Sequence, residues 1–392
     1  DVTAEIPDGY YTIGEEIDIK VTFQEKVIVN TDSGTPFITL DISGVNVEVE
    51  YTSGYDTETL IFKYTVGAGD NTAPGEFLNY IQDSVILLCQ PPWPGIYGEP
   101  ECLLGEAVRT MASLNLSGGT IKDLAGNNAI LIMPAPDSFG KEIIIDTIQP
   151  RVISVTTSKN DNTYREGTVI PIKVTFQEKV IVDTESGNPF ITLNLSGANI
   201  PVFYTNTDEP NSLLFNYTVG AGDNTAPGEF LNYVDTDSLH LSGATIKDVA
   251  GNDAILTLPV IGLTDLSEIK KEIVIDNIAP RITIESFKSD NCNPIFATIN
   301  DTITLSFTTN EDIIKPIVTF KDKETVVSKI DTDPKTWQAI YKVSAGDEDE
   351  ELDGYTIVFR DIAGNETTYN GEGLVTIDTT PPEVTIESFK SD

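Results

Sequence analysis

TVGAGDNTAPGEFLNY, residues 65–80, occurs a second time without any change as residues 218–233. The similarity continues on both sides of this stretch, since VTFQEKVIV at 21–29 recurs at 174–182. Self-similarity at a fixed distance is the signature of a chain built from repeated structural units. We therefore interpret the two segments as copies of one unit, each of which needs the same strand, turn and strand.

A shorter third unit carries the same landmarks in the same order, ending in RDIAGNE (360–366) and VTIDTTPP (375–382). The final residues TIESFKSD copy residues 283–290 at the start of that unit, so we expect the sequence to be part of a longer array. The predicted divisions are 1–147, 148–277 and 278–379 for three domains, and 380–392 for the start of a further repeat.

Apolar and polar residues alternate in short runs such as 17–23 and 60–66, which is the periodicity of half-buried strands. Clusters of Gly, Asp, Asn and Pro separate the runs, and no sustained helical spacing is present. The predicted fold is all-β: tandem immunoglobulin-like antiparallel β-sandwiches in an elongated array. Ile-Asp-x-x-x-Pro segments beginning at Ile145, Ile275 and Ile377 should form short, stiff links between the domains.

Charge and hydropathy exclude several classes of partner. With 62 acidic against 24 basic residues the net charge is −38, which repels nucleic acid and anionic lipid surfaces. No apolar window approaches the length of a membrane span, and the chain does not begin with a signal peptide. We expect neither nucleic-acid binding nor membrane insertion.

Catalytic patterns are missing from the sequence. The single histidine, His240, lies in the alternating stretch SLHLSG without a nucleophile motif, so we interpret it as a strand residue. Acidic residues are so numerous that no pair of carboxylates is distinguished. The acidic run GDEDEELDG (346–354) is interpreted as a solvated loop. These observations predict that the protein is not an enzyme.

Calcium is the cofactor that the sequence suggests. If NETTY (365–369) and LVTID (374–378) form a hairpin around NGEG, then Asp361 and Asn365 lie close to Asp378. Clusters of carboxylate and carbonyl oxygens suit calcium. The alternative is that each Asp-x-Ala-Gly-Asn is only a turn, in which Asp accepts backbone N–H bonds. Applied within each unit, the calcium hypothesis selects Asp123 and Asn127 with Asp146, Asp248 and Asn252 with Asp276, and Asp361 and Asn365 with Asp378.

The first unit contains an insertion of 28 residues at about 85–112, because the displacement between copies falls from 153 to 125 across it. Cys89 and Cys102 lie within it, and a disulfide between them would indicate an oxidising, extracellular setting. Trp93 and Tyr97 occupy its proline-rich tip and are candidates for binding a glycan or a protein. The other interpretation is that the loop packs against its own domain or the next.

The pattern VTFxExV, LxFxYTVxAGD, GGTIxDxAGNxA and IDTxxP resembles the bacterial Ig-like repeats of large surface and adhesin proteins, over essentially the whole chain. This resemblance implies an extracellular structural segment that extends, spaces or assembles a surface adhesin or filament. Its expected partners are neighbouring repeats of the array, a second copy in self-assembly, or a surface glycan or protein. The alternative function is an adhesive module that binds through the insertion.

Overall fold

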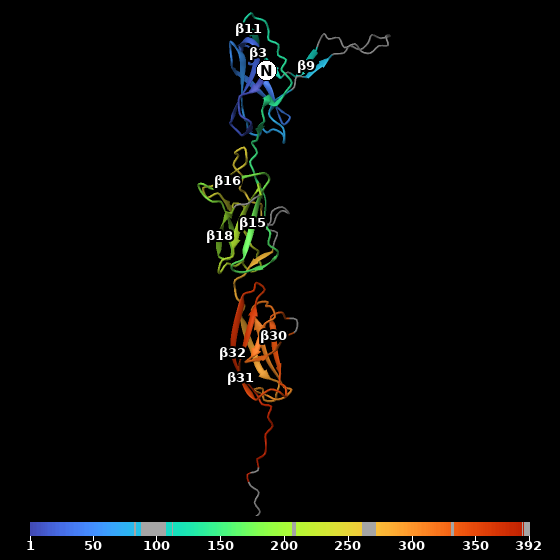
Figure 1. The fold of residues 1–392 in the computed structure, drawn as a ribbon, viewed down its shortest axis with the longest axis vertical. Helices are drawn as coiled ribbons and strands as arrows, with labels where there is room; N and C mark the ends of the chain where they lie inside the picture. The colour runs from blue at the N-terminus through green and yellow to red at the C-terminus, as the bar shows by residue number, and fades with distance from the viewer. Residues whose placement is uncertain are drawn as a thin grey trace, which may run out of the picture.

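The computed structural model describes residues 1–81, 84–87, 107–111, 113–205, 209–260, 272–330, 333–385 and 387. These residues form three β-sandwiches that follow one another along a single axis (Figure 1). Within the described residues, no helix is both long enough and apolar enough to cross a membrane.

Domain 1 is a sandwich whose larger sheet has the strand order β1-β3-β6-β5-β4-β10, with β11 on β3 and β7 on β4. Its last strand pairs in parallel with β2. The elements are β1 (Val2–Ala4), β2 (Gly9–Tyr11), β3 (Glu16–Asn30), β4 (Phe37–Ile42), β5 (Val45–Ser53), β6 (Thr57–Thr65), β7 (Asn79–Tyr80), β8 (Ser84–Leu87), β9 (Ala107–Met111), β10 (Leu114–Asn115), β11 (Thr120–Asp123), the 3₁₀ turn η1 (Ser138–Gly140) and β12 (Ile143–Ile145).

Domain 2 repeats this plan. Its sheet order is β13-β15-β19-β18-β17-β20, with β21 on β17, and β14 pairs in parallel with the last strand β23. The strands are β13 (Val152–Thr157), β14 (Asn162–Tyr164), β15 (Val169–Phe176), β16 (Ile181–Asp183), β17 (Phe190–Leu195), β18 (Ala198–Thr205), β19 (Ser212–Thr218), β20 (Asn232–Tyr233), β21 (Leu239–His240), β22 (Thr245–Lys247) and β23 (Ile273–Ile275).

Domain 3 shows the sandwich most clearly. The sheet β24-β26-β30-β29 faces the sheet β25-β32-β31-β27-β28, and β25 pairs in parallel with β32. Its strands are β24 (Ile282–Ser289), β25 (Phe296–Ala297), β26 (Thr302–Thr309), β27 (Ile317–Phe320), β28 (Lys323–Glu324), β29 (Val326–Lys329), β30 (Thr336–Lys342), β31 (Glu350–Arg360) and β32 (Glu366–Ile377). The chain is therefore all-β and built from tandem Ig-like sandwiches, as predicted.

Each domain has its own hydrophobic core, formed by the residues that alternate along the strands. In β3 the inward residues Ile17 and Ile19 are fully buried, and Ile170 and Ile172 are their counterparts in β15. Burial of one such side chain contributes about 1.5–3 kcal/mol. Because the three cores are separate, each domain carries the apolar contacts that it needs to fold.

The duplicated stretch begins with a half-buried pair of polar residues, which we call the polar lock. In domain 1 the Tyr64 hydroxyl donates to the Asp70 carboxylate at 2.7 Å, and the Gly67 N–H donates to the same oxygen at 2.8 Å. Burial and the neighbouring carboxylate raise the pKa of Tyr64 well above its usual value. The lock recurs in the other domains as Tyr217 with Asp223 and Tyr341 with Asp347.

The remainder of the stretch runs beside the last strand of its domain. The Thr72 and Leu78 N–H groups donate to the carbonyls of Ile145 and Ile143, at 2.9 and 2.8 Å. Domain 2 makes the same pair of bonds between its second copy of the stretch and β23. The sixteen identical residues thus fasten the strand that leads out of each domain, which gives the duplication a structural purpose.

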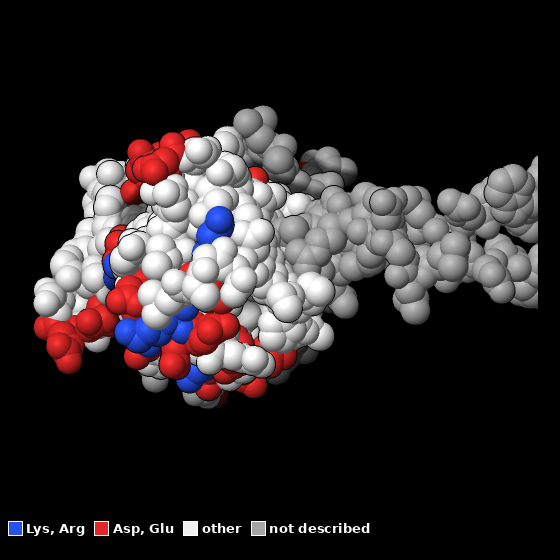
Figure 2. All heavy atoms as spheres, turned by 90° about the horizontal axis from the view of Figure 1, so that it is seen from above, with Lys and Arg blue, Asp and Glu red and all other residues white. Residues whose placement is uncertain are grey.

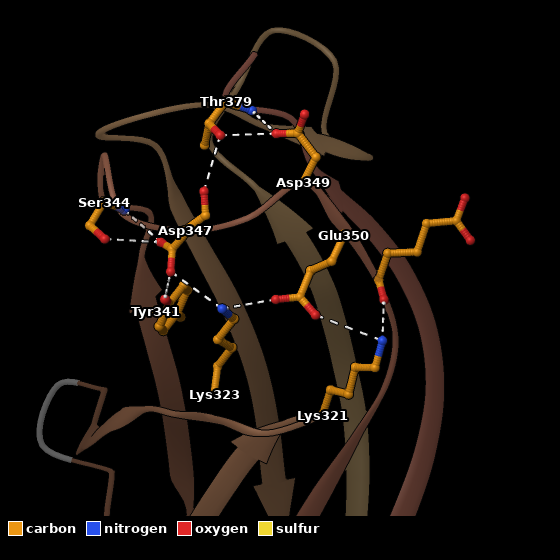
Figure 3. A network of polar contacts seen from close by, with 9 residues as sticks. Lys321, Lys323, Tyr341, Ser344, Asp347, Asp349, Glu350 and Thr379 are labelled. Atoms are coloured by element: carbon orange, nitrogen blue, oxygen red, sulfur yellow. Dashed lines mark hydrogen bonds and ion pairs between the residues drawn. The ribbon is translucent and has the colours of Figure 1, made fainter.

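The acidic run at 346–354 is only in part the solvated loop that we predicted, because Gly346, Glu348 and Asp349 are exposed but the strand β31 begins at Glu350. Asp347 accepts hydrogen bonds from Tyr341, from the Ser344 N–H and from the Lys323 ammonium (Figure 3). Lys323 also pairs with Glu350 at 2.8 Å. Burial alone raises the pKa of the Asp347 carboxyl, but these donors outweigh it and hold the pKa below its usual value. Within the run, Asp347 therefore belongs to the third lock, and Glu350 begins β31 and pairs with Lys323.

The predicted hairpin around NGEG is also wrong, because β32 continues through it as one strand. Its glycines mark close approach of aromatic rings and not a turn. A Cβ on Gly371 would lie 2.2 Å from the Tyr355 ring, and one on Gly373 would lie 2.6 Å from the Phe287 ring. This correction changes which residues meet at the candidate calcium site.

We expect the substitution Asp70→Ala to destabilise domain 1 by about 1.5–3 kcal/mol, because Tyr64 and the Gly67 N–H lose a charged acceptor. Differential scanning calorimetry would resolve the domain 1 transition. Glu58→Ala, which removes an exposed carboxylate from β6, is the matched control and should leave it unchanged. Equal effects of the two substitutions would show that the lock adds no stability.

Candidate functional site

The segment that leaves domain 1 is held to that domain by several bonds. The Thr147 N–H donates to the Asn71 side chain at 2.8 Å, and its hydroxyl donates to the Asp70 carbonyl at 3.2 Å. The Asp146 carboxylate accepts the Ile148 N–H at 3.0 Å, which forms a local turn. The linker therefore leaves domain 1 in a defined direction.

Domains 2 and 3 hold their exit segments in the same way. The Asn277 N–H donates to Asn224 at 2.8 Å, and the Thr379 N–H donates to Asp349 at 2.6 Å. Figure 3 shows Thr379 between Asp349 and the backbone of Asp347. One asparagine or aspartate in the loop after the lock thus orients each linker.

The Asp-x-Ala-Gly-Asn turn of domain 2 receives the linker of domain 1. The Asn252 side-chain amide donates both to Asp248, at 2.8 Å, and to the backbone carbonyl of Asp146, at 2.9 Å. The Asn252 side-chain carbonyl accepts the Thr12 hydroxyl of domain 1. Gly251 has φ of 95°, which explains the glycine in the turn. The Asp248 carboxylate also accepts the Asn252 backbone N–H at 2.8 Å, so the motif has the expected geometry of a turn, and its side chains also contact the preceding domain.

The second junction repeats the first. The Asn365 amide donates to Asp361 at 2.8 Å and to the backbone carbonyl of Asp276 at 2.9 Å. The Thr367 hydroxyl adds a bond to the Pro280 carbonyl at 2.9 Å. Both receiving aspartates are buried, with Asp248 3% exposed and Asp361 1% exposed.

The pairing of site residues within one unit, which we predicted, is wrong. Asn365 and Asp378 lie at opposite ends of β32, and a strand of this length spans about 40 Å. The partners come from consecutive domains: Asp146 meets Asp248 and Asn252, and Asp276 meets Asp361 and Asn365. Asp123 and Asn127 in domain 1, and Asp378 after domain 3, keep the local hydrogen bonds that their counterparts make at the two junctions.

A glutamate that the sequence prediction missed completes each junction. Carboxylate oxygens of Asp146, Glu178 and Asp248 lie within 4.8 Å of one another, and Asp276, Glu311 and Asp361 form the same group. The sequence does contain a signal for these glutamates, because both occupy the same position of the repeat, in VTFQEKVIV and in SFTTNEDI. Only the contact across the junction distinguishes them from the many other acidic residues.

The carboxylates of these two groups are partly buried and repel one another. Burial raises the pKa of Asp146, and the nearby Asp248 carboxylate raises it further. Burial, together with the charges of Asp146 and Asp248, likewise raises the pKa of Glu178. Glu311 shifts in the same direction through burial and Asp276. A divalent cation would offset this repulsion, and an oxygen-only donor set fits calcium.

The second group borders a hollow of about 300 Å³ lined also by Thr163 and Lys335. The Lys335 ammonium lowers the pKa of Glu311, but less than burial raises it. The hollow leaves room for water to complete the six to eight ligands that calcium takes.

The insertion leaves the side of domain 1 as the antiparallel hairpin β8–β9 (Figure 1). Trp93, Tyr97, Cys89 and Cys102 lie outside the described residues, so their roles remain predictions. His240 is a strand residue of β21, as predicted, and its ring packs on Phe190 with centroids 4.7 Å apart.

Comparison with models of protein families and with curated proteins finds no match for the sequence. Among solved structures, the chain is similar to a mutated three-Ig segment of titin, with 8% identity over 96% of this chain and 99% of that chain and a TM-score of 0.27. The full ectodomain of mouse nectin-like molecule 4 has 9% identity over 96% and 100%, with a TM-score of 0.23. Tandem Ig repeats of Dlar have 11% identity over 59% and 97%, with a TM-score of 0.15. The assignment of the fold therefore depends on the strand order and the cores described above.

We expect Asn252→Ala to loosen the first junction and to cost about 1–3 kcal/mol, because the buried Asp248 carboxylate loses its side-chain amide donor and the Asp146 carbonyl loses its partner. Small-angle scattering should show greater bending, and calorimetry a lower melting temperature for domain 2.

The matched control is Asn127→Ala, which alters the same turn of domain 1, where the amide bonds to Asp123 alone. It should leave the scattering profile of the dilute monomer unchanged. Equal bending in both variants would show that the amide does not hold the domains together.

Proposed function

We propose that the chain is an extracellular structural segment, without enzymatic activity, that extends and spaces a cell-surface assembly of the adhesin or filament type. The observation that carries this proposal is the pair of matching junctions. Each one holds its linker from both sides through the same residue types. A module that repeats the same contact to its neighbour at successive junctions is suited to a mechanical task.

The linker between domains 1 and 2 is expected to be stiff, because its backbone groups form hydrogen bonds to both domains. Asp146 and Thr147 bond to domain 1, whereas the Pro150 carbonyl accepts the Ile255 N–H of domain 2 at 2.8 Å. Arg151 forms a bridge with Ile255, and the buried Pro150 has a restricted φ. Bending the array would break these bonds, so an extended shape is favoured.

Calcium at the junctions is the second part of the proposal. Asp146, Glu178 and Asp248 would hold one ion, and the second group would hold another. Extracellular modules bind calcium with dissociation constants of about 10⁻⁴–10⁻³ M, which suits a shallow site made by two domains. Neutralising the carboxylates would lock the junction in a chain that carries a net charge of −38.

We expect removal of calcium by a chelator to lower the melting temperature and to increase the bending seen by small-angle scattering. Stabilisation by a ligand grows as RT ln(1 + [L]/Kd), or about 2.7 kcal/mol at a concentration 100 times Kd. Magnesium at equal ionic strength controls for screening of the surface charge. Identical melting and scattering with calcium and with chelator would refute the metal sites.

Glu178→Gln should have opposite effects in the two conditions. Without calcium it removes one of three repelling charges, so the junction should become more stable. With calcium it removes a ligand, so the gain from the ion should shrink. The matched control is Glu25→Gln, at the same repeat position in domain 1, where the side chain is exposed. A single direction of change in both conditions would contradict a calcium role for Glu178.

A further inference from the structure

The outward side of one sheet in domain 2 carries a row of three aromatic rings. His240 on β21, Phe190 on β17 and Phe203 on β18 are directly paired across these neighbouring strands. The ring centroids lie 4.7 Å apart between His240 and Phe190 and 5.6 Å apart between Phe190 and Phe203. Phe203 is 51% exposed and His240 is also exposed, so the row lies at the surface.

Uncharged side chains continue this side of the sheet. In the next outward row, Thr192 of β17 is paired with Pro201 of β18. In the row after that, Asn194 is flanked by Asn199 of β18 and Asn232 of β20. Every second residue of a strand points to the same side, so the three rows share one surface. We call these three rows the aromatic face of domain 2, and none of their residues is charged at neutral pH except by protonation of the histidine.

The equivalent face of domain 1 is acidic. Three exposed carboxylates stand where domain 2 has neutral residues: Glu50 for Phe203, Glu48 for Pro201 and Asp41 for Asn194. The register of the paired strands is the same in both domains. Figure 2, which looks along the long axis onto domain 1, shows acidic side chains in several groups with fewer basic ones among them. Domain 2 therefore lacks three negative charges on this one face, although long stretches of the two domains are identical.

The aromatic row is not needed to form the sheet. Domain 1 pairs the same strands with Glu50 opposite Phe37 and with Asn115 in the place of His240. Exposed aromatic rings grouped on one surface are characteristic of interaction sites, because apolar area left in water otherwise favours aggregation. Binding of a ligand therefore explains the row better than folding does.

Size and charge limit what the aromatic face can bind. Neighbouring strands lie about 4.8 Å apart and outward residues of one strand about 6.8 Å apart, so the three rows cover about 10 by 13 Å. A stable protein interface buries about 800 Å² on each partner, which is several times this area. A second copy would also bring its own net charge of −38 against the first. A short, uncharged ligand fits both limits.

We propose that the aromatic face of domain 2 binds a neutral oligosaccharide. The C–H groups on one side of a sugar ring would pack on the rings of Phe203 and Phe190, whose faces are electron-rich. The side-chain amides of Asn194 and Asn199 can both donate to and accept from sugar hydroxyl groups. A sialylated or sulfated glycan would be repelled by the many carboxylates of the chain and would bind more weakly.

An array of neutral mono- to tetrasaccharides, with sialylated and sulfated forms of the same glycans, tests the proposal on the full chain. We expect binding to neutral glycans and weaker binding to their charged forms. A chelator should leave this binding unchanged, because the aromatic face contains none of the junction carboxylates. The proposal is thus independent of the calcium sites, which melting and scattering test separately.

Two substitutions place the residues of domain 1 on the aromatic face. Phe203→Glu removes a ring and adds a carboxylate, so it should weaken binding of the neutral glycans selected by the array at least tenfold, as measured by NMR titration. His240→Asn should weaken it to a smaller extent. Both variants should fold, since domain 1 forms the same strands with these residues, and calorimetry checks the melting of domain 2. Glu50→Gln, at the equivalent position of domain 1, is the matched control and should bind as the unchanged chain does.

Three results would overturn the proposal. The first is a chain that binds no neutral glycan of the array, and the second is binding that survives both substitutions, which would place the site elsewhere. The third is association of the chain with itself that rises with concentration in sedimentation velocity and is lost in Phe203→Glu. That result would assign the aromatic face to a second copy.

Discussion

The arrangement of this molecule depends on one side-chain amide at each junction. Asn252 satisfies the Asp248 carboxylate of its own turn and, with the same nitrogen, the backbone carbonyl of Asp146 in the preceding domain. The turn must be folded for the amide to point outward, and the linker must be held for the carbonyl to meet it. Folding of one domain and placement of the next are thus coupled through a single group.

The polar lock of Tyr64 and Asp70 supports this joint from the other side. It fixes the loop whose next residue, Asn71, orients Thr147 of the linker. A half-buried carboxylate such as that of Asp70 stabilises the loop only while its donors are in place. The loop therefore has one well-defined shape, and so does the direction in which the chain leaves the domain.

Carboxylates gathered at the junctions work against stability by themselves. Burial, and then the charge of the neighbouring carboxylates, raises the pKa of Asp146, Glu178 and Glu311, which reflects the free-energy cost of holding these charges in a partly buried place. Stability can be raised locally by removing a charge, as Glu178→Gln is expected to do. The presence of three carboxylates at both junctions fits the proposal that a cation binds there. Under that proposal, the array is stiff when the cation is bound and bends more easily when it is removed.

Alternation of apolar residues and the exact repeat determined the fold class and the number of sandwiches, because strand burial is a local, period-two property. Local chemistry also identified the Asp-x-Ala-Gly-Asn turns.

The partners of these turns depended on tertiary structure. Gly371 and Gly373 look like a turn in sequence, yet they lie beneath aromatic rings in one continuous strand. That strand separates Asn365 from Asp378, so the turn of each domain meets the linker of the domain before it. Contacts between domains decide which of the many acidic residues share a site, and such contacts leave no local pattern in the sequence.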